Sequence, residues 1–264
     1  MTEKSRVTAN SYTSDFSVIE PGLLFFEREH LRKKPSREID VFANTWSLGI
    51  ANVQPNALAV HRRGSIIRKS GWWATFIPPF SIIDWELEPG FLCWKGYLST
   101  LPLPLDLPEQ AIAFPLRGDT LPPSANSIYE LVRHASEAFA INKEEQVSSV
   151  ARKAKTMIDD TFSDHEVTVL DVANLLEVSH SFLARTFRRA FGLTPVSYRN
   201  KLRVFEAMRL LLESGSTVTE VSHEVGFGDM ARFSKQFRSQ MNAKPSAFSI
   251  DMAINGRSED EKVS

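Results

Sequence analysis

A sixteen-residue segment near the C-terminal end of the sequence occurs twice, and this repeat limits what that part of the chain can fold into. The first copy, residues 183–198, reads LARTFRRAFGLTPVSY, and the second, residues 233–248, reads FSKQFRSQMNAKPSAF. Apolar positions, an arginine and a proline recur at an offset of fifty, as at Phe187 and Phe237. Upstream the offset is forty-nine, so the copies differ by one residue inside a predicted turn. One supersecondary unit used twice explains both offsets.

The first copy carries the signals of two short helices joined by a turn. Thr168 is suited to cap a helix that runs to Leu176, and Ser179 to cap a second helix over residues 180–191. Gly192 then fits the left-handed position that often follows a helix. Each feature favours a helix-turn-helix.

The second copy repeats this arrangement. Either Thr217 or Thr219 caps its first helix, Gly226 supplies the turn, and Asp229 caps a second helix over residues 230–241. Between the copies, a proline in the first turn opens a long helix, predicted over residues 195–213. Arg209 on this helix is expected to pair with Glu206 or Glu213.

Short motifs at fixed spacings run through both copies. They are Val172-Ala173, Val178-Ser179, LARTF at 183–187, FGLTP at 191–195, Tyr198, VGFGD at 225–229, FSKQF at 233–237 and Lys244-Pro245-Ser246. With them, the stretch from about Ser148 to Ile250 resembles the DNA-binding domain of the AraC/XylS family of transcription regulators. Ser222 and Asn242 stand where the family usually has alanine and glycine, and both are tolerable because serine is small and asparagine accepts the left-handed conformation.

The exposed face of each second helix is predicted to enter a major groove, which is wide enough to admit a helix. The resemblance implies that the base-facing positions are Ser181, Ala184, Arg185, Met230, Ala231 and Lys235. Arg185 is the strongest candidate, because a guanidinium can donate two hydrogen bonds to guanine. Neighbouring residues are expected to contact phosphates or flank the bases, namely His180, Arg188, Arg189, Arg199, Lys201, Arg203, Arg232, Ser234 and Arg238.

The first half of the chain has another character. Residues 39–53 and 72–85 are rich in β-branched and aromatic residues, and twelve of the fourteen prolines precede residue 124. The sequence therefore predicts an α+β protein of two domains, with a sandwich or small barrel first; the resemblance implies a cupin-like barrel that senses or dimerises. The expected division is a β-rich domain with a proline-rich strap at 1–123, a helical linker at 124–147, the DNA-binding domain at 148–250 and a polar tail at 251–264.

Three hypotheses stay open for the β-rich half: it responds to a ligand or partner, it is an enzyme, or it only dimerises. The tryptophans at 46, 72, 73, 85 and 94 are candidates to line an apolar effector pocket, although core or dimer-interface positions are the commoner role. Cys93, the single cysteine, would be the nucleophile if the chain were an enzyme that uses its DNA-binding unit for targeting. In the third hypothesis this half only dimerises. The six histidines are scattered, and neither a metal site nor a cofactor is predicted.

Net charge alone does not indicate a nucleic-acid partner, because it is −1 for the 264 residues. Residues 164–250 carry eleven Lys/Arg against nine Asp/Glu, so the case for DNA depends on where the basic residues lie. No membrane span or signal-peptide core is apparent. The expectation is a cytoplasmic, non-enzymatic transcription regulator that binds double-stranded DNA, acts with RNA polymerase as a homodimer, and responds to a small-molecule effector or a partner.

Overall fold

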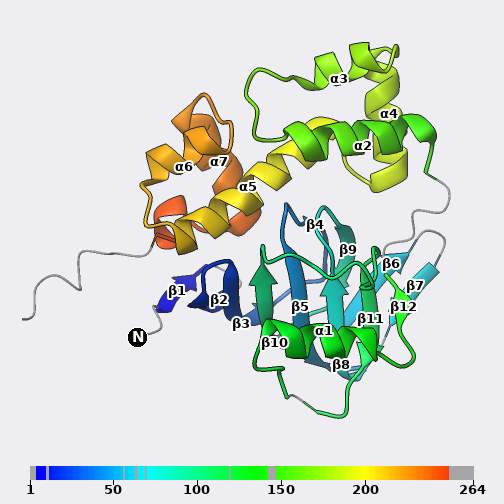
Figure 1. Cartoon of the computed structure of the whole chain (residues 1–264), viewed down its shortest axis with the longest axis vertical. Coiled ribbons are helices and arrows are strands. Elements are labelled where there is room, and N and C mark those ends of the chain that lie inside the picture. The colour runs from blue at the N-terminus through cyan, green and yellow to red at the C-terminus, as the bar shows by residue number, and fades with distance from the viewer. Residues whose placement is uncertain are drawn as a thin grey trace, which may run out of the picture.

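The computed structural model describes residues 4–9, 12–55, 57–62, 65–68, 70–118, 120–141 and 147–249. The expected polar tail at 251–264 lies outside these residues. Two parts stand out in Figure 1: a β-rich part formed by the first half of the chain and a helical part formed by the second half. The predicted α+β fold with two domains is confirmed.

The β-rich part consists of two antiparallel sheets. The eight-stranded sheet has the order β1 (Lys4–Thr8), β2 (Tyr12–Glu20), β3 (Leu23–Arg32), β10 (Gly90–Ser99), β5 (Trp46–Val53), β8 (Gly71–Ile77), β11 (Ile112–Pro115) and β12 (Phe139–Ala140). The four-stranded sheet has the order β4 (Ser36–Val41), β9 (Ile82–Leu87), β6 (Leu58–Arg62) and β7 (Ser65–Arg68). Among the described strands the two sheets do not join into a closed barrel.

Residues 124–141, which fall within the stretch expected as a helical linker, pack against the β-rich part. Helix α1 (Ala125–Arg133) buries Ile128, Tyr129 and Val132 against this domain, with the Tyr129 ring 5.8 Å from that of Trp46. After α1 the chain forms β12, which pairs with β11. The three-to-four-residue spacing predicted more helix than forms, because an apolar residue of a short edge strand fits the same pattern.

The proline-rich strap is held to the β-rich part by hydrogen bonds to its carbonyls. Trp46 Nε1 donates to the Leu101 carbonyl at 2.8 Å, and Tyr97 Oη donates to the Pro122 carbonyl at 2.6 Å. A proline-rich strap cannot form a regular sheet ladder because its prolines have no N–H, and these side chains provide donors for two of its carbonyl groups.

The helical part contains two helix-turn-helix units around one long helix. Its elements are α2 (Ser149–Thr161), α3 (Val169–Leu175), α4 (His180–Phe191), α5 (Pro195–Glu213), α6 (Val218–Glu224), α7 (Met230–Met241) and a 3₁₀ turn (Pro245–Ala247). The bounds of α4 and α7 are those predicted. Thr168, Ser179, Thr217 and Asp229 cap their helices through side-chain acceptors, which decides between Thr217 and Thr219 in favour of the former.

The turns of the two units reach the same backbone conformation with different residues. Glu177 has φ +54° in the first turn, and Gly226 has φ +85° at the matching place in the second. A side chain at Glu177 projects into solvent. A Cβ atom at Gly226 would lie 2.2 Å from the Ser163 carbonyl oxygen and 2.8 Å from Nη2 of Arg203.

The two parts share one apolar core rather than touching at their surfaces. The Phe42 ring, just after β4, lies 5.2 Å from the ring of Phe205 on α5, and the Phe16 ring on β2 lies 6.1 Å from that of Phe248. Tyr12 Oη also donates a hydrogen bond to the Met241 carbonyl at the end of α7. The β-rich part therefore contacts both α5 and α7.

We predict that Gly226→Ala destabilises the protein strongly, while Glu177→Gly changes little. The alanine at 226 meets backbone within van der Waals distance as well as a disfavoured φ, so we expect a loss of about 3 kcal/mol or more in the free energy of unfolding. At 177, relief of the left-handed conformation and added chain entropy nearly cancel, within about 1 kcal/mol. Urea denaturation of both variants measures this; Gly228→Ala, where a Cβ meets nothing within 4 Å, is the control.

Candidate nucleic-acid interface and interdomain cavity

Helix α4 separates an apolar face from a polar one. Leu183 and Phe187 are fully buried, whereas Ser181, Arg185 and Arg188 are exposed. His180 and Arg189 are exposed as well, and Ala184 is half-buried. Every candidate on this helix is therefore accessible, and all of them except Ala184 can donate hydrogen bonds.

Helix α7 presents a different surface from the same fold. Phe233 and Phe237 are buried, while Ala231, Arg232, Lys235 and Arg238 are exposed and Ser234 is half-buried. A surface hollow runs along this face, lined by Met230, Ala231, Ser234, Lys235, Arg238 and Ser239. Met230 is partly withdrawn from solvent, because its sulfur accepts a hydrogen bond from Ser222 Oγ at 2.9 Å and its side chain packs on the core.

Helix α5 fixes the distance between these two faces. It has nineteen residues, which span about 28 Å at ~1.5 Å per residue, against roughly 34 Å for one turn of DNA.

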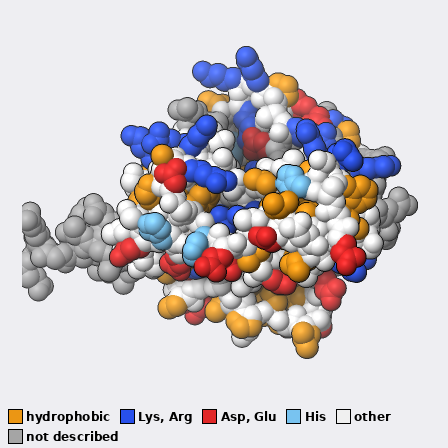
Figure 2. Space-filling view, turned by 90° about the horizontal axis from the view of Figure 1, so that it is seen from above, with side chains coloured by type: hydrophobic (Ala, Val, Ile, Leu, Met, Phe, Trp, Pro, Cys, Tyr) orange, Lys and Arg blue, Asp and Glu red, His pale blue; other side chains and the backbone are white. Residues whose placement is uncertain are grey.

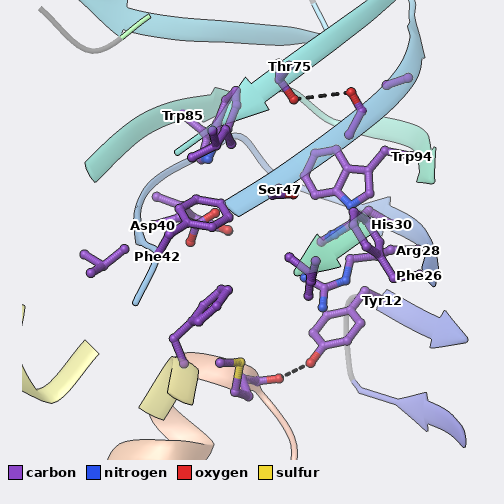
Figure 3. A pocket seen from close by; sticks show the side chains of 18 of the residues that line it. Tyr12, Phe26, Arg28, His30, Asp40, Phe42, Ser47, Thr75, Trp85 and Trp94 are labelled. Carbon is purple, nitrogen blue, oxygen red and sulfur yellow. Dashed lines mark hydrogen bonds between the residues drawn. The ribbon is translucent and has the colours of Figure 1, made fainter. Parts of the chain in front are cut away.

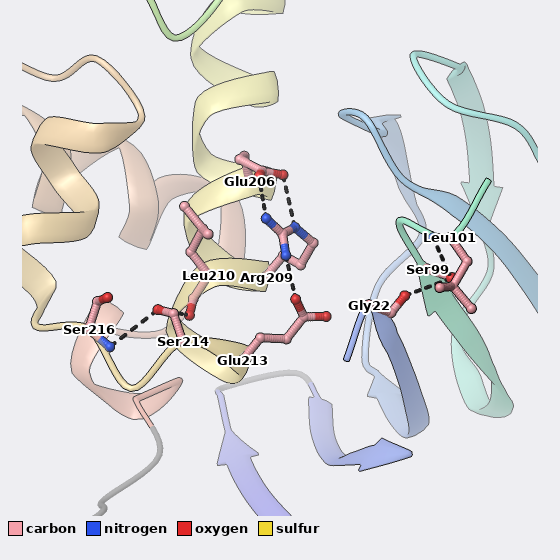
Figure 4. A network of polar contacts seen from close by, with 9 residues as sticks. All are labelled: Gly22, Ser99, Leu101, Glu206, Arg209, Leu210, Glu213, Ser214 and Ser216. Atoms are coloured by element: carbon pink, nitrogen blue, oxygen red, sulfur yellow. Dashed lines mark hydrogen bonds and ion pairs between the residues drawn. The ribbon is translucent and has the colours of Figure 1, made fainter. Parts of the chain in front are cut away.

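On α5, Arg209 pairs with both Glu206 and Glu213, as predicted (Figure 4). Figure 2 looks onto the helical part from above. Most of the Lys and Arg side chains on this face lie in the upper half of that view.

Arg203, predicted from the sequence as a phosphate contact, is buried. Only 4% of the residue is exposed, and its guanidinium donates to the carbonyls of Phe162 and Asp164 and lies 5.6 Å from the Phe227 ring centroid. Burial lowers the pKa of this guanidinium to about 10. This position does not favour the phosphate contact predicted from the sequence, because Arg203 links the end of α2 to the second unit.

Lys201 and Arg199 are also less available than expected. Lys201 is half-buried and lines the cavity beside the β-rich part. Burial raises the pKa of the Asp40 carboxyl group there, and the nearby charge of Lys201 partly opposes this shift. In this structure Lys201 is not placed as a phosphate contact. Arg199 is half-buried, and its guanidinium donates to the Val167 carbonyl.

A cavity of about 200 Å³ lies between the two sheets and the helical part (Figure 3). Three of the five tryptophans, Trp73, Trp85 and Trp94, line it, whereas Trp46 is core. Phe205 of α5 and Met241 of α7 close its other side. About 10–15 Å³ of such volume holds one water, so this cavity has room for a small organic molecule.

The surroundings of Cys93 do not favour the reactive thiolate that the enzymatic hypothesis needs. Burial, with the carboxylates of Glu27 and Glu29 nearby, raises the pKa of the Cys93 thiol, which makes its reactive thiolate scarcer. Across the described parts of the chain, no three His, Cys, Asp or Glu side chains are grouped to hold a metal ion. No helix there is long and apolar enough to cross a membrane.

Comparison with known proteins places the two helical units in a family. A family profile described as a helix-turn-helix domain matches residues 172–249. The lactose operon transcription activator of Staphylococcus xylosus is 27% identical over 132 residues, which are 49% of this chain and 47% of that protein. The transcriptional activator RhaS of Salmonella arizonae is 39% identical over 88 residues, 33% of this chain and 31% of RhaS. The chain thus matches less than half the length of these relatives.

The fold of the whole chain also has a counterpart. The structure of ToxT from Vibrio cholerae superposes with a TM-score of 0.51 over 86% of this chain and 97% of ToxT, at 9% identity. This superposition shows a shared fold. The profile match makes residues 172–249 a helix-turn-helix domain, and its two units are of the AraC/XylS type that the motifs predicted.

We predict that Arg203→Met lowers the free energy of unfolding by about 1–3 kcal/mol, because two backbone carbonyls lose a charged donor. The salt dependence of DNA binding should not change, since no phosphate contact is removed. Thermal melts and a salt titration of DNA affinity test both parts. Arg188→Met, an exposed arginine on α4, is the control and should leave stability intact. A salt slope that falls by about one unit in Arg203→Met would restore the phosphate role.

Proposed function

We propose that this protein is a sequence-specific transcription regulator that inserts α4 and α7 into successive major grooves of double-stranded DNA. The observation that carries the proposal is the pair of capped, exposed helix faces held at a fixed separation by α5. The base-facing residues are Ser181, Ala184, Arg185, Met230, Ala231 and Lys235. The surrounding phosphate or flanking contacts are His180, Arg188, Arg189, Arg199, Arg232, Ser234 and Arg238. Lys201 and Arg203 are left out, because one lines the cavity and the other is buried.

The two helices read different sequences with unequal strength. Helix α4 offers the long donors Arg185 and His180, whereas α7 offers the apolar Met230 and Ala231, which suit contacts with thymine methyl groups. Arg185 supplies most of the direct discrimination, and DNA shape supplies part of the rest.

The β-rich part controls this activity through an effector or a partner. Its contacts with α5 and with the end of α7 support this, because an occupant of the cavity would touch the helices that set the reading geometry. Contact with RNA polymerase and homodimerisation through the first half of the chain remain predictions from the family resemblance. Calorimetry against a panel of metabolites tests the effector, and no heat with any of them would favour a part that only dimerises.

We expect Arg185→Ala to weaken binding to the preferred site by about 1–3 kcal/mol and to relax the choice of base at one position. Its physical reason is the loss of a bidentate contact with guanine. Selection of sites from random DNA, followed by anisotropy titrations on the selected and a scrambled duplex, measures both effects. Arg152→Ala removes the same charge from an exposed position of α2 and serves as the control. An equal loss on both duplexes would contradict base reading.

A further inference from the structure

Helix α7 begins with a methionine whose sulfur is bonded to the neighbouring helix α6. Met230 is the first residue of α7, and its sulfur accepts a hydrogen bond at 2.9 Å from Oγ of Ser222. Ser222 is fully buried, whereas Met230 is half-buried, packs on the apolar core and also lines the surface hollow of α7. The sulfur is therefore held from inside the protein, while the side chain forms part of the face proposed to meet DNA.

This bond restricts a side chain that is otherwise flexible. Methionine is unbranched and adapts its shape to what surrounds it, so by itself it reads a single position poorly. The hydroxyl group of Ser222 has one hydrogen, which the Met230 sulfur shares with the Thr219 carbonyl oxygen at 3.0 Å. Beyond the sulfur a methionine has only its methyl group, so fixing the sulfur leaves one torsion to place that methyl group. Ser222 thus limits where the methyl group of Met230 can lie.

The first unit provides an internal comparison, because it has the same fold without this bond. Ala173 matches Ser222 at the offset of forty-nine, and His180 matches Met230 at the offset of fifty. Ala173 is fully buried and has no side-chain donor, and His180 is exposed at the start of α4. Packing of the unit therefore needs no hydroxyl group here. A buried hydroxyl is costly unless it is bonded, so its contact with Met230 points to a role in α7.

We propose that Ser222 is a positioning residue, which sets the base preference of α7 by holding the Met230 methyl group against one thymine methyl group in the major groove. Apolar contact with that methyl group is how a side chain without donors favours thymine. This inference rests on the proposed function and deepens it, because it assigns the specificity of one position to a residue that is not at the surface. Ser222 is buried, so it acts on DNA only through Met230.

The test removes single methyl groups from the DNA. The site that the full chain selects from random DNA is made again with deoxyuridine in place of each thymine in turn, which deletes only the methyl group. Arg185→Ala shows which half of the site α4 reads, so the other half belongs to α7. In that half we expect one deoxyuridine to weaken binding of the unchanged chain about fourfold, the scale of burying one methyl group. In Ser222→Ala the same deoxyuridine should weaken binding less than about twofold.

Three further variants separate positioning from packing. Met230→Leu keeps an apolar side chain but has no sulfur to hold, so it should lose the same discrimination. Adding Ser222→Ala to Met230→Leu should then change the discrimination no further, because the two residues act as one pair. Thr219→Ala removes an exposed hydroxyl group from α6 and keeps the carbonyl, so it is the matched control and should bind like the unchanged chain. Thermal melts confirm that each variant folds.

The hold on Met230 can also be measured without DNA. The chain has six methionines, and with isotope-labelled methyl groups the NMR signal missing from Met230→Leu identifies Met230. The order parameter of this methyl group reports its fast motion. It should fall in Ser222→Ala and stay the same in Thr219→Ala. A serine that only packs α6 would change the melting temperature and leave the order parameter as it is.

Three results would overturn the inference. One is a folded Ser222→Ala variant that keeps the full loss of affinity on deoxyuridine. Another is an unchanged order parameter of the Met230 methyl group in that variant. The third is an α7 half-site in which no deoxyuridine weakens binding of the unchanged chain. In each case the chain still selects a DNA site, whereas failure of the proposed function would leave the unchanged chain with no preferred site and would overturn both.

Discussion

The burial of helix α5 is the constraint on which the rest of the structure depends. Ten of its nineteen residues are buried, and they lie on several sides of the helix rather than on one stripe. Tyr198 and Leu202 pack in the core of the first unit, while Ala207 and Leu211 pack in a core shared by the second unit and the β-rich part. A helix that is apolar on most sides needs neighbours on most sides. The distance between α4 and α7 and the position of the β-rich part are therefore both set by α5.

The sequence predicted those features that depend on local chemistry. Capping by Thr168, Ser179 and Asp229 needs only a side-chain oxygen near free backbone N–H groups, so the bounds of α4 and α7 could be read from residues alone. The left-handed Asn242 was recognisable for the same reason. Repetition strengthened these predictions, because two copies had to agree in one fold.

Features that depend on contacts distant in sequence were missed. Arg203 and Lys201 looked like exposed cations on a helix, but whether a long side chain meets DNA, a carbonyl or another domain is decided by what packs there. Arg28, His30 and Arg32 of β3 line the cavity. The sequence does show that basic residues alternate at these positions. The pattern alone could not tell which face was inside, because acidic residues alternate with the basic ones.

The shared core has a consequence for the order in which the chain becomes protected during synthesis. The Phe16 side chain on β2 is covered by Phe248, so the two contacting residues are made 232 positions apart. At ~5–20 residues per second, the apolar surface of the β-rich part stays uncovered for on the order of ten seconds or more. During that interval the nascent β-rich domain is exposed to chaperones and to self-association, and Phe16 is covered only after the last turn before residue 250 has been made.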